Sequence, residues 1–126
     1  MHWQPIQDKS AGAGAYSRAV RAGDFIFVSG HVPRDPQTGE MTGASYGEQT
    51  IVVIDRLAEA LAQAGATLGD VVSMTVYLAD INGWAEFNEA YRQRMPMPFP
   101  TRTTVGAQLH GCLVEISAIA YLPTPR

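Results

Sequence analysis

The chain has 126 residues, 46% of them hydrophobic and 17% charged, which suits one domain with a packed core and argues against a disordered segment. Its formal net charge is −3, and its single lysine, Lys9, lies in a polar N-terminal stretch. The sequence therefore lacks the clustered positive charge that a nucleic-acid backbone requires, and nothing near Lys9 would activate its amine for Schiff-base chemistry.

The N-terminal stretch MHWQPIQDKS lacks the basic and apolar regions of a signal peptide, and no run approaches membrane-spanning length. We expect a cytoplasmic protein that forms a single domain over residues 1–126. Cys112 is the single cysteine, so no intrachain disulfide is possible, and we expect it to be a small packed residue. The three histidines, His2, His31 and His110, have no ligand spacing, so we expect neither a metal nor a cofactor.

The first third of the chain predicts strands joined by turns. The strand candidates are three β-prone runs: residues 3–6, 17–22 and 25–29. The last two form a hairpin because Ala22-Gly23-Asp24 supplies a turn, and Gly30 ends the second strand. Residues 11–16 form a loop of small residues, and Asp35-Pro36-Gln37-Thr38-Gly39 is a further turn.

Two helices are predicted in the middle of the chain. Ser45-Tyr46-Gly47-Glu48 has the Ser-x-x-Glu form of a capping box, and Gly65 stands where a helix-ending glycine belongs. Between them, apolar residues recur at helical spacing: Ile51, Ile54, Leu57 or Ala58, and Leu61. The second helix starts at residues 80–83, and four residues share its apolar stripe: Trp84, Phe87, Asn88 and Tyr91. The aromatic residues there belong to a core or an interface, whereas Asn88 needs a polar partner, either a neighbouring loop or a ligand.

The second half of the chain also predicts strands, at residues 71–78, 101–105 and 112–121, with a turn around His110-Gly111. In the first of these, alternation places Val72, Met74, Val76 and Leu78 on one face and Val71, Ser73, Thr75 and Tyr77 on the other. The order of strands, helix, strand, helix and strands predicts an α+β fold. We expect two helices on one face of a mixed sheet of five to six strands.

The run Phe25-Ile26-Phe27-Val28 is apolar on both of its faces. Two helices cover only one side of such a sheet, and the other side would leave a large apolar patch in water. We therefore expect a closed homo-oligomer that buries this sheet face between subunits. The alternative is a loop of the same chain that covers it.

Arg102 lies in the Thr-rich strand that follows the helix-breaking run Met95-Pro96-Met97-Pro98. Strand alternation points Arg102 and Thr104 one way and Thr101, Thr103 and Val105 the other. A guanidinium held on a short strand is suited to gripping a carboxylate through two parallel hydrogen bonds. From spacing alone, an ordinary surface salt bridge remains the alternative.

Seven segments of the chain follow the order and spacing of one family. They are residues 14–17, 28–33, 35–40, 76–81, 87–91, 99–103 and 114–120, including Gly14-Ala15-Tyr16-Ser17, Val28-Ser29-Gly30-His31, Phe99-Pro100-Thr101-Arg102-Thr103 and Glu115-Ile116-Ser117-Ala118-Ile119-Ala120. Each segment is a weak signal alone, but together and in this order they are a strong one, and the match extends over essentially the whole chain. The sequence resembles the RidA (YjgF-like) family.

This resemblance implies a chorismate-mutase-like fold and a homotrimer with three clefts between subunits. It also implies hydrolysis of reactive 2-imino or 2-enamino acids to 2-keto acids and ammonia. Arg102 matches the arginine that binds the substrate carboxylate, and Tyr16 matches the tyrosine of the Gly-x-Tyr loop. The remaining cleft residues that the resemblance implies are Ser29, Gly30, Asn88 and the backbone after Arg102, at Thr103 and Thr104.

Two positions depart from the pattern of the best-studied enzymes of the family. Thr104 replaces a cysteine, and Ser117 replaces the last-strand carboxylate expected one residue before Ala118-Ile119-Ala120. In the absence of that acid, we expect Ser117, Tyr16 or a backbone carbonyl to hold the attacking water. Glu115 lies on the same strand face but about 7 Å away, so we expect a salt bridge there rather than catalysis.

Three functions of different class remain open. The first is an imine or enamine deaminase, either broad or dedicated to a pathway intermediate such as aminoacrylate or aminomuconate. The second is a non-catalytic trimer that binds small carboxylates, which the loss of the last-strand acid favours. The third is an endoribonuclease, a label that the family sometimes carries, which the acidic charge and the lack of a basic patch disfavour. His31 either lies near the cleft mouth or is an ordinary turn residue.

Overall fold

The computed structural model describes residues 1–6 and 14–125, so residues 11–13 of the predicted loop at residues 11–16 lie outside the described range. Its strands are β1 (Trp3–Pro5), β2 (Ala19–Ala22), β3 (Phe25–His31), β4 (Val71–Leu78), β5 (Thr101–Gly106) and β6 (Val114–Tyr121). Its helices are α1 (Tyr46–Gln63) and α2 (Trp84–Arg94), with short 3-10 turns η1 (Leu68–Asp70) and η2 (Ile81–Gly83).

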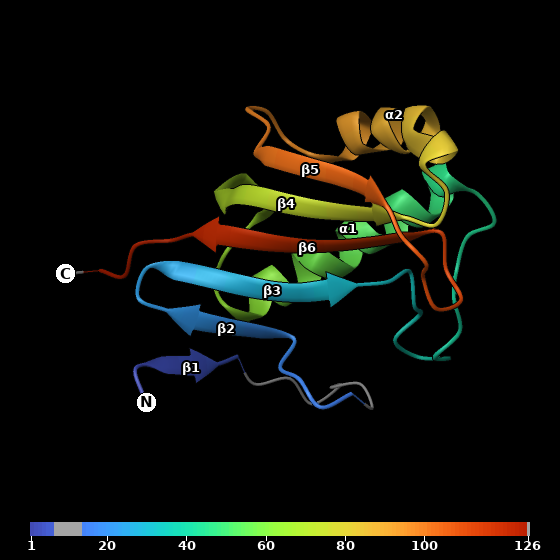
Figure 1. Cartoon of the computed structure of the whole chain (residues 1–126). Coiled ribbons are helices and arrows are strands. Elements are labelled where there is room, and N and C mark those ends of the chain that lie inside the picture. The colour runs from blue at the N-terminus through green and yellow to red at the C-terminus, as the bar shows by residue number, and fades with distance from the viewer. Residues whose placement is uncertain (7–13, 126) are drawn as a thin grey trace.

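The six strands form one mixed sheet in the order β1-β2-β3-β6-β4-β5. Only β4 and β5 run parallel, because α2 carries the chain back between them, and the other neighbours are antiparallel. Both helices pack on the same side of the sheet, and β5 forms the edge next to α2 (Figure 1). The predicted α+β fold with two helices on one face is confirmed.

Helix α1 forms where its capping signals predict it. The amide of Glu48 donates to Ser45 Oγ at 3.1 Å, and the Glu48 carboxylate accepts from the amide of Ala44 at 3.0 Å. These contacts satisfy backbone donors that an α-helix leaves unpaired at its start. At the other end, Gly65 has a φ of 81°, a left-handed conformation that glycine adopts without steric cost.

The predicted faces of β4 are wrong at its first two residues. Val71 is buried and Val72 is 43% exposed, the reverse of the alternation expected from Met74 onward. The register against β6 shifts between Val71 and Ser73, and such a bulge moves the flanking side chains to the opposite face. The last strand also begins two residues later than predicted, at Val114, although Cys112 is buried as expected.

One face of the sheet is uncovered in the protomer. Ile26 and Val28 are buried beneath the helices, whereas Phe25 and Phe27, which alternate with them, are each 42% exposed. Tyr121 of β6 pairs with Phe25 and is also exposed, with their ring centroids 5.3 Å apart. Exposed aromatic residues gathered on one face mark an interaction surface.

Of the helices in the described residues, none is long and apolar enough to cross a membrane.

Candidate functional site

Arg102 is held by the apolar stripe of α2. Its guanidinium carbon lies 4.7 Å from the ring centroid of Tyr91, 5.1 Å from that of Phe87 and 5.6 Å from that of Trp84. Its Nη1 donates to Asn88 Oδ1 at 2.9 Å. The spacing of these helix residues places them on one face, so the sequence builds a stack of rings with a single acceptor among them.

The charge of Arg102 has no ionic partner in the part of the chain that the structure describes. Burial lowers the pKa of Arg102, the Tyr91 hydroxyl raises it, and the neighbouring Arg92 lowers it. A partly desolvated guanidinium without a carboxylate favours an incoming anion. Among the described residues, Arg102 therefore does not form the ordinary salt bridge that the sequence left as an alternative.

Arg102 lines a hollow of about 330 Å³, which we call the arginine hollow. Its lining residues come from α2 and from the segment that leads into β5: Asn88, Tyr91, Arg92, Phe99, Pro100 and Arg102. Thr104 shares the strand face of Arg102, and its buried hydroxyl has no hydrogen-bond partner among the described residues. Thr103 is exposed on the other face. The hollow thus offers a cation, an amide and aromatic surface to a small ligand.

The other predicted site residues gather at the far end of β3. A second hollow, of about 460 Å³, contains Tyr16, Ser29, Gly30 and Glu115, and we call it the tyrosine hollow. The Ser29 hydroxyl donates to the carbonyl of Ser17 at 2.6 Å, which ties β3 to the loop that carries Tyr16. A Cβ at Gly30 would lie 2.4 Å from Glu115 Oε2, so only glycine lets this carboxylate approach the backbone.

The acid of the tyrosine hollow is Glu115, whereas the sequence analysis placed the site residue of this strand at Ser117. Ser117 lies opposite Thr75 on the same sheet face and lines none of the hollows described here, so its role stays a prediction. The fixed spacing along a strand disfavours Glu115 as a replacement for an acid at position 117. The approach of Gly30 to Glu115, which has no signal in the sequence, brings this carboxylate beside Ser29 and Tyr16.

A bulge in β3 explains the place of His31. The register of β3 against β6 shifts between Val28 and His31, so His31 pairs with Ile116 and points to the buried face. His31 is 8% exposed and belongs to the strand, so the interpretation as a turn residue is wrong. Across residues 1–6 and 14–125, no group of histidine, cysteine or carboxylate side chains has the arrangement of a metal site.

The arginine and tyrosine hollows do not meet within one protomer. Arg102 is on edge strand β5, and β4 and β6 separate β5 from β3 (Figure 1). At the usual strand spacing, β3 and β5 are roughly 14 Å apart. Arg102 also projects toward the helices, whereas Glu115 lies on the opposite face of the sheet. Of the predicted site residues, the arginine hollow therefore holds Asn88 and Arg102, and the tyrosine hollow holds Tyr16, Ser29 and Gly30.

Comparisons with known proteins decide the family. The sequence model of the Endoribonuclease L-PSP family matches residues 7–122. A RutC family protein of Pyrococcus abyssi is 44% identical over 110 residues, which cover 86% of this chain and 87% of that protein. This chain belongs to the RidA (YjgF-like) family. Within that family, the human 2-iminobutanoate/2-iminopropanoate deaminase is 36% identical, over 89% of this chain and 84% of its own.

A solved structure supports the same assignment. RidA from an Antarctic Psychrobacter bacterium superposes with a TM-score of 0.88 at 32% identity, covering 94% of this chain and 99% of that one. The predicted RidA-type fold is thus confirmed, and the family includes imine deaminases. The relatives that match most of this chain establish its fold and family.

Proposed function

We propose that this protein hydrolyses 2-imino and 2-enamino acids to 2-keto acids and ammonia, in clefts between the subunits of a homotrimer. The observation that carries the proposal is the Arg102 guanidinium, held by three aromatic rings and Asn88 and open to the arginine hollow without a carboxylate. Such a group binds the carboxylate that every 2-imino acid carries next to its reactive carbon.

The trimer brings the two hollows together in this proposal. The uncovered face with Phe25 and Phe27 supports burial between copies of the chain, since exposed aromatic residues of this kind favour association. A neighbouring subunit would then place its tyrosine hollow against Arg102. The cleft would combine a carboxylate-binding arginine from one subunit with Glu115, Tyr16 and Ser29 from the next.

The reaction needs orientation and one proton acceptor. Arg102 binds the substrate carboxylate, and Glu115 accepts a proton from a water molecule as its oxygen bonds to the iminium carbon. The nitrogen of the tetrahedral amino alcohol then takes this proton back from Glu115, and the carbon–nitrogen bond breaks to release ammonia. The proton of the new hydroxyl passes to Glu115 and from there to solvent, which leaves the ketone of the 2-keto acid. Tyr16 and the backbone at Gly30 orient the water and the substrate, and Ser117 remains a candidate for holding a further water.

A coupled assay tests the proposal. An amino-acid oxidase generates 2-imino acids of several side chains, including 2-aminoacrylate, and the rate of keto-acid formation is measured with and without the protein. We expect clear acceleration by the wild type and a loss of roughly 100-fold in kcat/KM for Arg102→Ala, because two charge-assisted hydrogen bonds disappear. The matched control is Arg94→Ala, since Arg94 forms a surface ion pair with Asp55 at 2.7 Å.

Two other outcomes would redirect the assignment. Saturable binding of 2-ketobutyrate that depends on Arg102, without turnover of any imine, would favour a carboxylate-binding trimer. An Arg102→Ala variant as fast as the wild type would overturn the proposal. We do not propose endoribonuclease activity, because the net charge of −3 offers no basic surface for RNA.

A further inference from the structure

The first turn of α1 lies beside the start of α2, and two hydrogen bonds join these segments in opposite directions (Figure 1). The Tyr46 hydroxyl, on α1, accepts from the amide of Asp80, the residue before η2, at 3.0 Å. The Glu86 carboxylate, on α2, accepts from the amide of Gly47, on α1, at 2.6 Å. We call these two contacts the helix clamp. Neither side chain has a role in the proposed deaminase reaction.

The two segments approach each other closely at the clamp. Tyr46 packs against the hydrophobic core, which limits the movement of its ring. A Cβ at Gly83 would lie 2.6 Å from a ring carbon of Tyr46, so a larger residue there would push the ring or the start of α2 aside. Glu86 satisfies an amide that α1 leaves unpaired at its start, where a negative charge is favourable. The clamp therefore fixes how α2 begins relative to α1.

The start of α2 has little other support. Its N-cap is Gly83, and among the described residues no side chain caps α2 directly. The cap of this segment stands further back, where the Asp80 carboxylate accepts from the amide of Asn82 in η2 at 2.9 Å. Asp80 is also the residue whose amide donates to Tyr46. The position of η2 and of the helix that follows it thus depends on α1 as well as on local sequence.

The residues that follow the clamp are the ones that hold Arg102. Trp84 is the first residue of α2, and its ring centroid lies 5.6 Å from the guanidinium carbon of Arg102. Phe87 and Asn88 come directly after Glu86 and contact the same guanidinium. Successive turns of an α-helix are joined by backbone hydrogen bonds, so they move together. A shift at the start of α2 would therefore displace both the rings and the acceptor that orient Arg102.

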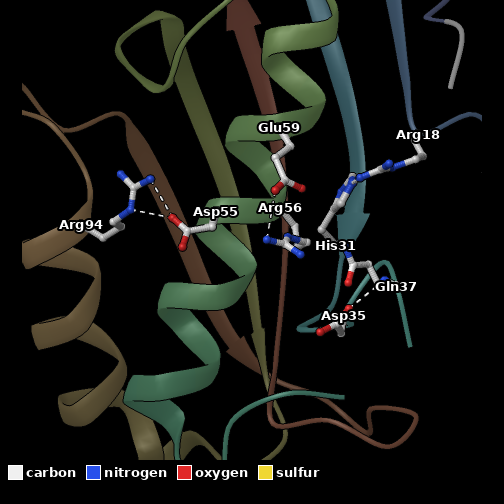
Figure 2. Close-up of polar contacts among 8 residues, drawn as sticks. All are labelled: Arg18, His31, Asp35, Gln37, Asp55, Arg56, Glu59 and Arg94. Carbon is white, nitrogen blue, oxygen red and sulfur yellow. Dashed lines mark hydrogen bonds and ion pairs between the residues drawn. The ribbon is translucent and has the colours of Figure 1, made fainter. Parts of the chain in front are cut away.

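A second contact between the two helices lies at the opposite end of α2. Asp55, on α1, accepts from Nε and Nη2 of Arg94 at 2.8 and 2.7 Å (Figure 2). Arg94 is the last residue of α2 and lies beyond Tyr91, the last of the helix residues that contact Arg102. This ion pair holds α1 and α2 together without touching the start of α2, so it provides a comparison for the clamp.

We propose that the helix clamp positions Arg102 for ligand binding, with Tyr46 and Glu86 as positioning residues that act through α2. The lining of the arginine hollow includes neither residue. An arginine binds a carboxylate through two parallel hydrogen bonds, so its affinity depends on the direction of the guanidinium plane. The expected effect on imine hydrolysis rests on the proposed function, whereas the effect on the position of the Arg102 guanidinium does not.

The Arg102 Nε–H signal in a ¹H–¹⁵N spectrum of the full chain tests the clamp without any ligand. Aromatic rings that stack on a guanidinium displace this signal, and its loss in Arg102→Ala assigns it. In Tyr46→Phe and in Glu86→Gln we expect it to move toward the position of an exposed arginine. Asp55→Asn is the matched control, because it weakens the same helix pair at the other end and should leave the signal unchanged.

Steady-state kinetics of imine hydrolysis provide the second readout. Tyr46→Phe and Glu86→Gln should each raise KM roughly fivefold and change kcat less, because a displaced guanidinium binds the substrate carboxylate less well. In an Arg102→Ala background the same changes should have no further effect on kcat/KM, since the clamp acts through Arg102. A merely structural role would lower the melting temperature without this dependence on Arg102.

The outcomes separate the clamp from the proposed reaction. An unchanged Arg102 signal in both clamp variants, an equal shift in Asp55→Asn, or a wild-type KM in a variant whose signal moves would overturn the proposal. So would the same loss of kcat/KM with and without Arg102. A shifted signal in a protein that hydrolyses no imine would support the clamp and count against the deaminase function instead. Thermal unfolding verifies that each variant is folded.

Discussion

The arginine hollow and the tyrosine hollow are built in opposite ways. Arg102 is positioned by the core of its own protomer, because Phe87 and Tyr91 beneath it are almost fully buried and their rings fix the guanidinium. Tyr16, in contrast, is 57% exposed and reaches its hollow from a loop beside the β3 bulge. In the proposed site, the binding group is therefore complete in one chain, whereas the groups proposed for the chemistry would need another chain to enclose them.

The sharpest test concerns which residue of β6 carries the chemistry. Glu115→Gln should lower kcat for imine hydrolysis roughly 100-fold, because the amide cannot accept the proton of the attacking water. Ser117→Ala should lower it less than about threefold, since Ser117 lies outside the tyrosine hollow. Steady-state kinetics of both variants decide between them. The opposite ranking would restore Ser117 as the catalytic residue and assign Glu115 a structural role.

Mixed oligomers test whether the two hollows belong to different subunits. Subunits carrying Arg102→Ala and subunits carrying Glu115→Gln are unfolded together and refolded at equal amounts. A cleft shared between neighbours is intact when the first variant supplies Glu115 and the second supplies Arg102, so about a quarter of the wild-type activity should return. Each variant refolded alone is the control. Recovery no greater than the average of the two controls would place the whole site within one chain.

Replacing Asn88 should impair imine hydrolysis less than replacing Arg102 or Glu115, because Asn88 acts through Arg102. Its Oδ1 is the single acceptor on α2 for the Arg102 guanidinium, at 2.9 Å. Asn88→Ala should raise KM by about tenfold through loss of one charge-assisted hydrogen bond, with kcat changed less. Asn88→Asp is informative in the other direction, since a carboxylate there would occupy Arg102 and compete with the substrate. An unchanged KM in both variants would separate Asn88 from substrate binding.

The smallest expected effect is a shift in the pKa of Cys112, which reports the negative charge of Glu115 in the tyrosine hollow. Burial raises the pKa of the Cys112 thiol, and the Glu115 carboxylate raises it further. Removing that negative charge in Glu115→Gln makes the thiolate less unfavourable, so the pKa of Cys112 falls. The midpoint of the alkylation rate against pH should move to lower pH by roughly a few tenths of a unit. Ser117→Ala, as a control, should leave the midpoint where it is.

Much of the fold follows from local signals in the sequence. The capping residues Ser45 and Glu48, the helix-ending Gly65 and the apolar periodicity between them specify α1 because each satisfies a backbone or packing requirement within one turn. The bulges at Val71–Ser73 and Val28–His31 could not be predicted, because they depend on how β6 pairs with both neighbours. Strand alternation alone therefore assigned Val72 to the wrong face.

The sequence indicates candidate site residues where local chemistry or the family resemblance marks them, and not where a tertiary contact alone does. Asn88 and Arg102 were found from helix spacing and strand chemistry together with the family resemblance. The sequence disfavours Glu115, because the close approach of Gly30 is a tertiary contact with no local signal. Tyr46 and Asp80 are 34 positions apart in the sequence, and only the packing of α1 beside the start of α2 brings them into contact.

The uncovered aromatic face of the sheet has a consequence for how the protein would be controlled. If Phe25 and Phe27 are buried by the same association that completes the clefts, then dilution separates the half-sites before any chain unfolds. The activity per chain would fall as the protein becomes scarce. Total activity would therefore fall more steeply than in proportion to the amount of protein. The abundance of the protein would then act as a threshold on its own chemistry.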